Sequence, residues 1–204
     1  MEDIDIITFE QYLDGKVIDQ CYYFGSFNPI HNDHINNAVS TRKQYGFNVV
    51  LVPTPQSPEK NPKDLAPFED RVAMCRIAAN KYGFTVNDIE GKMPQPNYTI
   101  KTIEKLYPDQ NVKVPFLVGT DQVLNFHLWN SAPELAKRLV LILSNRNALP
   151  VNNPNLKLDI KPLNGVNTGI SATEIREKIR AGLSINNLVP PEVAAYIEEK
   201  GLYK

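Results

Sequence analysis

Short apolar runs alternate with segments of helical periodicity along most of the chain. Five apolar runs predict strands near residues 20–24, 48–53, 84–87, 113–118 and 139–143. Amphipathic segments between them predict helices near residues 33–45, 68–82, 98–107 and 132–138. Typical stop signals follow three of these helices, at Gly46, Gly83 and Pro108. The alternation predicts an α/β fold with a doubly wound parallel sheet that is covered by helices on both faces.

The composition is that of a globular chain. It has 204 residues, of which 42% are hydrophobic, and this is enough for a sizeable core in a single domain. No apolar run approaches membrane-spanning length, and residues 1–5 are acidic where a secretory signal would be basic. We therefore predict a cytoplasmic protein without a membrane partner.

Charge and cysteine content narrow the range of partners. The formal net charge of −1 argues against a general nucleic-acid binder, which normally carries a basic excess, but local phosphate sites are compatible with it. Cys21 falls in a predicted strand and Cys75 in a predicted helix, so we expect two reduced, buried thiols and no disulfide. The sequence leaves open whether copies of the chain form a homo-oligomer.

Residues 25–34 carry the clearest chemical signal. Gly25 permits a tight turn after the first predicted strand, and Asn32 is a candidate cap of the next helix. His31 and His34, three residues apart, fall on one helical face beside free N–H groups and a partial positive charge. The segment therefore predicts phosphate binding. Two alternatives stay open: metal ligation, although no cysteine or acidic cluster has a matching spacing, and a role as solvated helix caps.

A second signal opens a helix far downstream. Ser171 and Glu174 form a capping box, and the apolar positions that follow belong to an ordinary amphipathic face. Arg176 lies off that face, about one turn into the helix. Its guanidinium can form a bidentate hydrogen bond with a phosphate that the helix N–H groups also bind.

Together the two segments resemble the motifs of the nucleotidylyltransferase superfamily. GSFNPIHNDH at residues 25–34 is similar to G-x-F-x-P-x-H-x-x-H, and ISATEIR at residues 170–176 is similar to I-S-x-T-x-x-R. From about Cys21 onward the chain resembles the nicotinate (or nicotinamide) mononucleotide adenylyltransferases. Supporting matches are Asn97-Tyr98-Thr99, Gly119-Thr120-Asp121, Phe126 with Trp129, and the closing segment 199–203.

The resemblance implies a Rossmann-like fold and an enzyme of NAD biosynthesis. Such an enzyme transfers the adenylyl group of ATP to nicotinate mononucleotide and forms nicotinate adenine dinucleotide and pyrophosphate. Nicotinamide mononucleotide is the alternative acceptor. The domain would span residues 20–204, and residues 1–19 would form a packed extension without catalytic duty.

The resemblance also implies roles for single residues. The implied catalytic residues are His31, His34 and Arg176. The implied ATP-binding residues are Gly25, Ser26, Phe27, Gly119, Asp121, Ile170, Ser171 and Thr173. The implied mononucleotide-binding residues are Lys60, Tyr98, Thr99, Trp129 and Arg146. Mg²⁺ would accompany ATP and be held mainly by phosphate oxygens, without dedicated protein ligands.

Several of these residues also have plain structural interpretations. Lys60, in the proline-rich loop 53–67, could be a solvated lysine, and Trp129 could be a core residue. Asp121 could cap the helix that follows it. We expect His127 to be structural.

Departures from the family pattern bear on ATP and on the acceptor. Asp33 stands where the family usually has glycine, and its carboxylate would repel ATP unless it faces away or reaches Mg²⁺. Ala172 lacks a hydroxyl, and Asn130 replaces a frequent tyrosine. A helix that opens near Tyr98 offers N–H groups to a carboxylate, which favours nicotinate. Two other functions stay open: nucleotide binding without turnover, and nucleotidyl transfer to an acceptor such as phosphopantetheine.

Overall fold

Two compact units alternate along the chain in this computed structural model, which describes residues 18–56, 65–144, 153–165 and 167–204. Unit 1 contains Met1–Tyr23, Ala38–Val49 and Tyr98–Gly165, and unit 2 contains Phe24–Asn37, Val50–Asn97 and Val166–Lys204. Among the described residues, no helix is long and apolar enough to span a bilayer.

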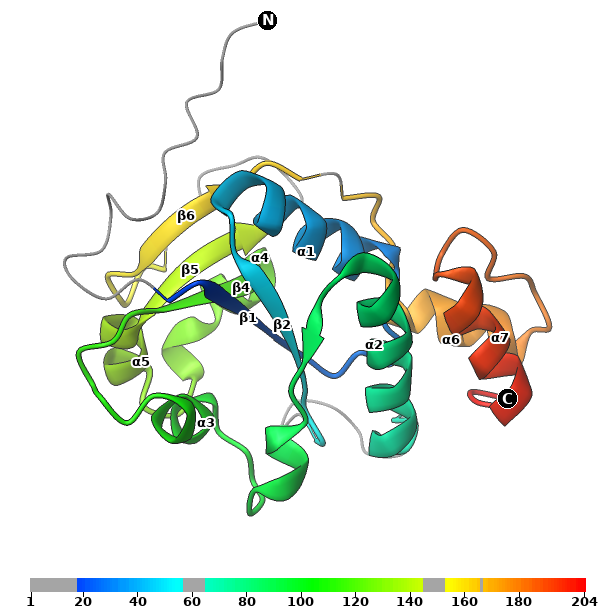
Figure 1. The fold of residues 1–204 in the computed structure, drawn as a ribbon, viewed down its shortest axis with the longest axis horizontal. Coiled ribbons are helices and arrows are strands. Elements are labelled where there is room, and N and C mark those ends of the chain that lie inside the picture. The colour runs from blue at the N-terminus through cyan, green and yellow to red at the C-terminus, as the bar shows by residue number, and fades with distance from the viewer. Residues whose placement is uncertain (1–17, 57–64, 145–152, 166) are drawn as a thin grey trace, which may run out of the picture. The chain divides into compact units, whose positions relative to one another are not determined.

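Six strands form the sheet (Figure 1). They are β1 Gln20–Gly25, β2 Asn48–Pro53, β3 Thr85–Val86, β4 Val114–Gly119, β5 Leu139–Ser144 and β6 Asp159–Leu163. Their order is β3-β2-β1-β4-β5-β6, and β1 pairs with β4, β2 with β3, β4 with β5 and β5 with β6, always in parallel. This order is the one typical of Rossmann-like sheets and confirms the predicted doubly wound fold.

The helices are α1 Asn32–Tyr45, α2 Phe68–Tyr82, α3 Thr99–Leu106, α4 Thr120–Leu124, α5 Ala132–Arg138, α6 Ala172–Arg180 and α7 Pro191–Lys200, with 3₁₀ turns at η3 Ile89–Lys92 and η4 Phe126–Leu128. Four helices, α1, α2, α3 and α5, lie where the pattern predicts them, whereas α4 after β4 was not predicted. The predicted bounds of α2 and α5 are those observed. Gly83 ends α2 in the left-handed conformation (φ 71°), where its N–H bonds to the carbonyl of Ala79.

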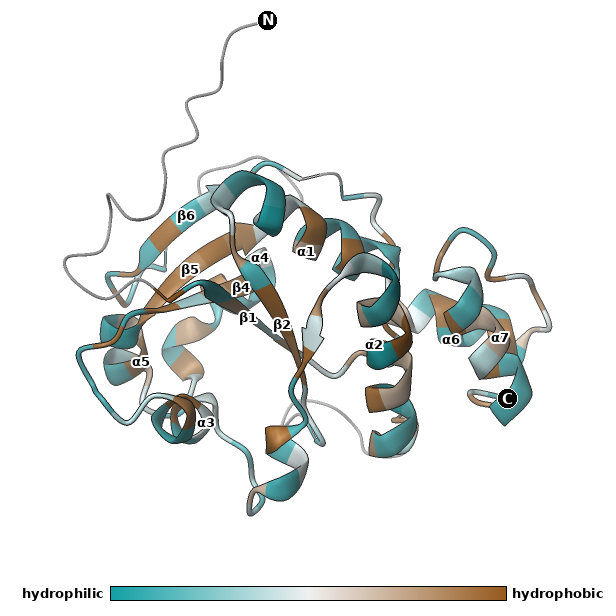
Figure 2. Cartoon of the chain, viewed as in Figure 1, coloured by the Kyte–Doolittle hydropathy of each residue, from teal (hydrophilic) through white to brown (hydrophobic). Residues whose placement is uncertain are grey.

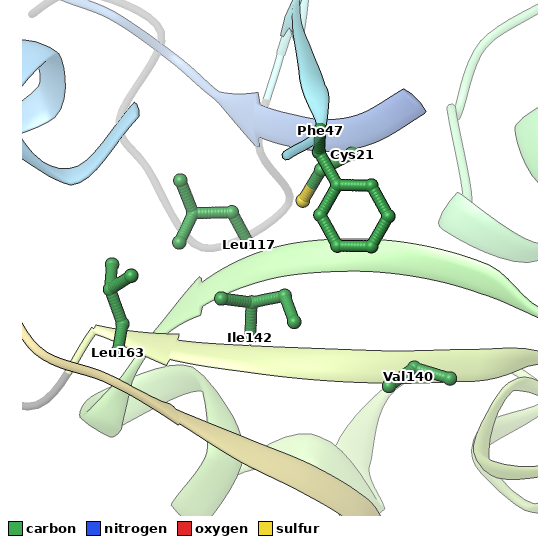
Figure 3. Close-up of a cluster of buried hydrophobic side chains, with 6 residues drawn as sticks. All are labelled: Cys21, Phe47, Leu117, Val140, Ile142 and Leu163. Atoms are coloured by element: carbon green, nitrogen blue, oxygen red, sulfur yellow. The ribbon is translucent and has the colours of Figure 1, made fainter. Parts of the chain in front are cut away.

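The core of unit 1 lies against β4 and β5. Both strands are continuous apolar runs, as expected for parallel strands that are buried on both faces, and both are brown in Figure 2. The cluster drawn in Figure 3 consists of Cys21, Phe47, Leu117, Val140, Ile142 and Leu163. Cys21 in unit 1 and Cys75 in unit 2 are both buried, and both thiols are free. Burial raises the pKa of the Cys21 thiol. The expectation of two buried thiols is thus confirmed.

In unit 2, α2 packs against α7. The hydroxyl of Tyr196 donates to the carboxylate of Asp70 at 2.7 Å, and the ammonium of Lys81 donates to Glu192 at 2.7 Å. The first contact is partly buried, whereas the ion pair is exposed and adds little to stability. Packing and the Tyr196–Asp70 bond therefore fix α7 beside α2.

The edge strand β6 was not among the predicted strands. Its sequence, DIKPL, contains no apolar run. An edge strand is partly exposed to solvent and can carry lysine and proline, so it lacks the apolar pattern of a central strand. At the other edge, β3 is two residues long where a strand near 84–87 was expected. The sequence pattern thus predicts the centre of the sheet better than its edges.

Candidate active site

The first motif is a strand, a tight loop and a helix, as predicted. β1 ends at Gly25, and a Cβ atom there would lie 3.1 Å from the ring of Phe27. A larger residue at this position would require the ring to shift by a few tenths of an ångström. Phe27 has a φ of 44°, an uncommon conformation for a side chain with a Cβ, and Ser26 and Asn28 beside it are buried. The loop is therefore held in a specific, tightly packed conformation.

The two histidines of this motif lie against each other. Their ring centroids are 3.6 Å apart and the rings are nearly parallel, but His31 directly precedes α1 and only His34 lies in the helix. The Nδ1 atom of His34 accepts a hydrogen bond from the backbone N–H of His31 at 3.2 Å. His34 thus caps the start of α1, and the ring of Phe27 contacts it edge-on. Asn32, expected as the cap, is instead the first helical residue, and its amide donates to the carbonyl of Asn187.

The late motif opens α6 in the predicted way. The hydroxyl of Ser171 caps the helix by accepting from the N–H of Glu174 at 3.1 Å. From Arg176, Nη1 donates to the carbonyl of Asn28 at 2.9 Å and Nη2 to the hydroxyl of Thr173 at 3.2 Å. Among the described residues, the buried Nε of Arg176 has no hydrogen-bond partner. Arg176 therefore joins the two motifs within unit 2 and retains a donor.

Asp33 does not stand free beside the histidines. Its buried carboxylate accepts hydrogen bonds from Thr168 and from the N–H of Ile170, just before α6. The sequence alternatives for Asp33 were repulsion of ATP, a position facing away, or contact with Mg²⁺. The structure shows the carboxylate engaged by the late motif.

A residue that the sequence reasoning missed is Arg71 of α2. It is 1% exposed, and its guanidinium donates to four backbone carbonyls at 2.6–3.0 Å, those of Ser26, Thr54, Pro55 and Ala66. Burial lowers its pKa, and the carbonyl dipoles replace part of the lost hydration. A signal was available, because Arg71 lies four residues before Cys75 on the buried face of the helix.

The predicted mononucleotide residues that the structure describes lie in unit 1. Trp129 is half-buried, and its ring stacks on Phe126 at 4.9 Å and meets Phe116 edge-on at 6.0 Å. Tyr98 directly precedes α3, and Thr99 is the first residue of that helix. Trp129 thus combines the predicted packing with a partly exposed ring.

Gly119 and Asp121 begin the helix that follows β4. A Cβ atom at Gly119 would lie 2.8 Å from the carboxylate of Asp121, an exposed side chain that would have to move aside for it. Asp121 does not cap α4: it is exposed, and its carboxylate accepts from the amide of Gln122 at 2.9 Å. His127 lies 3.3 Å from the amide of Asn153, which also donates to two backbone carbonyls, in accord with a structural role.

Two predicted site residues, Lys60 and Arg146, lie outside the described residues, as do residues 1–17. The described part of the chain holds no group of three or more histidine, cysteine, aspartate or glutamate side chains placed to bind a metal ion.

Comparison with known proteins agrees with this geometry. A sequence profile of the cytidylyltransferase-like family matches residues 22–178. A probable nicotinate-nucleotide adenylyltransferase of Dehalococcoides mccartyi is 31% identical over 191 residues, which cover 88% of this chain and 94% of the relative. A protein of the same name from Wigglesworthia glossinidia brevipalpis is 30% identical over 209 residues, which cover 93% and 99%.

A solved structure shares the fold. Plasmodium falciparum nicotinic acid mononucleotide adenylyltransferase complexed with NaAD superposes with a TM-score of 0.68 at 21% identity, over 90% of this chain and 96% of that one. Fold and profile together define the class: the chain belongs to the cytidylyltransferase-like family. Its relatives narrow this to the nicotinate-nucleotide adenylyltransferases, an enzyme family, which confirms the resemblance seen in the sequence.

Proposed function

We propose that this protein transfers the adenylyl group of ATP to nicotinate mononucleotide and releases pyrophosphate. The observation that carries the proposal is the contact between the two motifs, where Arg176 reaches the loop that precedes His31 and His34. Family membership supports the reaction type, and the names of the relatives support the acceptor.

The substrates supply the reacting groups themselves. A phosphate oxygen of the mononucleotide attacks the α-phosphorus of ATP in line, a new P–O bond forms there, and the bond from the α-phosphorus to the bridging oxygen breaks. Pyrophosphate takes the electron pair of that bond. The protein then needs no nucleophile of its own and acts by positioning the reactants and stabilising charge.

The predicted phosphate-binding residues of unit 2 each have a proposed task in this step. His31 and His34 donate to the triphosphate as charge grows on the leaving oxygens, and Ser26 contacts the α-phosphate. Arg176 binds the leaving pyrophosphate with its guanidinium, whose Nε is unpaired among the described residues. The N–H groups at the start of α6, after Ser171, add donors for the same oxygens.

Mg²⁺ fits this arrangement as an ion that arrives with ATP. Phosphate oxygens and water would hold it, and it would neutralise charge on the triphosphate. The one carboxylate between the histidines, that of Asp33, already accepts three hydrogen bonds from Thr168 and Ile170. Direct ligation by Asp33 would require breaking them.

The acceptor half would use residues of unit 1. Trp129, which is half-buried and stacked on Phe126, would offer ring area to the pyridine, with Tyr98 and Thr99 beside it. Tyr98 precedes α3 without capping it through its side chain, which leaves the N–H of Thr99 as a donor for the nicotinate carboxylate. Gly119 and Asp121, also in unit 1, are the residues that the resemblance assigns to ATP, and they would take up ribose hydroxyls.

We further place the protein in the cytoplasm, without a nucleic-acid partner. The two cysteines are free and buried, as is common in reducing compartments, and the formal net charge is −1.

Pyrophosphate release tests the proposal. Purified protein is supplied with ATP, Mg²⁺ and one acceptor at a time: nicotinate mononucleotide, nicotinamide mononucleotide or phosphopantetheine. We expect the highest kcat/KM with nicotinate mononucleotide, and a loss on the order of tenfold or more with the amide, whose NH₂ would lack an acceptor in a site of donors. If pyrophosphate release were fastest with phosphopantetheine, nicotinate mononucleotide would be the wrong acceptor. If no acceptor gave release, the protein would bind nucleotide without turnover.

A further inference from the structure

Asp33 connects the helix of the first motif to the segment that opens the second. It is the second residue of α1 and is 1% exposed. Its Oδ1 accepts from the N–H of Thr168 at 3.0 Å and from the hydroxyl of Thr168 at 2.8 Å. Its Oδ2 accepts from the N–H of Ile170 at 3.0 Å. All three residues belong to unit 2, although more than 130 positions separate Asp33 from Thr168 and Ile170 in the sequence.

These bonds do more than place an acid at a helix start. An acid in the first turn stabilises a helix wherever its side chain points, and it does not have to be buried for that. Burying a carboxylate is costly unless hydrogen bonds replace its hydration. Here three such hydrogen bonds come from Thr168 and Ile170, the residues on either side of Gly169, whose φ is 81°. The carboxylate therefore fixes the conformation of this short segment.

The segment in turn sets where the late motif begins. Ser171, directly after Ile170, caps α6, and Arg176 of that helix donates to the carbonyl of Asn28. In the first motif, Asp33 lies between His31 and His34 in the sequence, and the rings of these two histidines are stacked. One carboxylate thus joins the backbone of both proposed phosphate-binding segments.

We propose that Asp33 is a positioning residue that holds α6 and Arg176 in the arrangement needed to bind the ATP phosphates together with the histidines. The inference rests on the proposed use of ATP. Asp33 does not contact ATP in this role. It acts through the segment that it anchors, and its negative charge is directed onto the N–H and O–H groups of that segment.

The proposal and a simple charge effect predict opposite changes. If the carboxylate repelled ATP, Asp33→Asn and Asp33→Gly would lower the KM for ATP. If Asp33 anchors the segment, Asp33→Asn places an NH₂ where an acceptor is needed and Asp33→Gly removes all three bonds. We expect the KM for ATP to rise roughly tenfold in Asp33→Asn and further in Asp33→Gly.

Variants of Thr168 test the same bonds with a smaller perturbation. Thr168→Val keeps the shape of the side chain and removes only the hydroxyl, and we expect a rise in the KM for ATP of about three- to tenfold. Thr168→Ser restores the hydroxyl and should lie within about twofold of wild type. In an Asp33→Asn background, Thr168→Val should add less than about twofold, because the bond is already lost.

The experiment combines steady-state kinetics with calorimetric titration of ATP into the acceptor-free protein. Asp70→Asn is the matched control, since Asp70 is also a partly buried carboxylate of unit 2 that joins two elements, through Tyr196. We expect the KM for ATP to change in the Asp33 and Thr168 variants while the KM for the acceptor stays constant. A general loss of structure would instead lower the active fraction, and with it kcat, at unchanged KM.

Folded Asp33→Asn protein with an unchanged or lowered KM for ATP would overturn the proposal. If the Asp33 variants do not fold, the Thr168 pair decides: equal KM values for ATP in Thr168→Val and Thr168→Ser would overturn it as well. Failure of the proposed function is a separate outcome, in which the wild type releases no pyrophosphate with any acceptor.

Discussion

Two buried arginines show how differently the two units hold their loops. Arg71 in unit 2 uses all three of its side-chain nitrogens on four carbonyls. Arg138 in unit 1 donates from Nη2 alone, to the carbonyls of Tyr107 and Asp109. Within the described residues, the buried Nε and Nη1 of Arg138 have no hydrogen-bond partner. Arg71 therefore joins three separate segments, at Ser26, at Thr54 and Pro55, and at Ala66, whereas Arg138 holds a single short segment.

The predicted acceptor residues of unit 1 are joined less closely. In the described part of unit 1, no hydrogen bond connects Tyr98, Thr99 and Trp129 to one another. Preorganised groups stabilise a transition state well because they need not reorganise during reaction. We therefore expect substitutions at the phosphate-binding residues of unit 2 to affect turnover, ATP binding or stability, and substitutions at Tyr98, Thr99 and Trp129 of unit 1 to act on acceptor binding.

The largest expected effect is that of His34→Ala in unit 2. Removing one donor to the developing charge should lower kcat by roughly 10²- to 10³-fold, with an unchanged circular dichroism spectrum. His127→Ala in unit 1 is the matched control, because this histidine lies by Asn153 and has no proposed contact with the substrates. Near wild-type kcat in His34→Ala would remove the residue from the mechanism and weaken the contrast between the units.

Arg71→Lys tests the anchoring of the loop segments that Arg71 binds, at Ser26, Thr54, Pro55 and Ala66. A lysine ammonium cannot reach four carbonyls in the geometry of a guanidinium, so buried acceptors lose their donors. We expect the free energy of unfolding, from urea denaturation, to fall by roughly 2–4 kcal/mol. Arg76→Lys on the same helix, where the side chain is 58% exposed, should change it little. Equal unfolding free energies for the two variants would show that Arg71 does not anchor these segments.

A smaller effect is expected for Trp129 in unit 1. Trp129→Leu removes the aromatic surface and should raise the KM for nicotinate mononucleotide by about tenfold, while the KM for ATP stays constant. Leu128→Ala, at a neighbouring side chain that is 71% exposed, should change neither constant. If Trp129→Leu raised both constants equally, the division of labour between the units would be wrong.

The doubly wound parallel sheet and the strand-loop-helix of the first motif could be predicted from the sequence because both depend on local patterns. Apolar runs mark β4 and β5, and the capping box at Ser171 marks α6, so each element is visible from its own residues. The family resemblance then identified the histidines and Arg176 as partners, and the contact of Arg176 with Asn28 agrees with it.

The bonds of Asp33 and Arg71 could not be predicted in the same way. Asp33 accepts from residues about 135 positions away, and no local periodicity reports such a pairing. A carboxylate next to a phosphate motif suggests repulsion until its partners are known, and a lone arginine on an apolar face suggests only that something polar lies opposite. Tertiary hydrogen bonds of this kind depend on the folded arrangement of several segments.

The destination of each ATP phosphate tests the central claim most directly. Wild-type protein is incubated with nicotinate mononucleotide, Mg²⁺ and ATP labelled at either the α- or the γ-phosphate, and the products are separated and identified by mass. Adenylyl transfer predicts the α-label in nicotinate adenine dinucleotide and the γ-label in pyrophosphate. A γ-label in the acceptor product, or α-label that stays in ATP while the acceptor remains unchanged, would contradict the account.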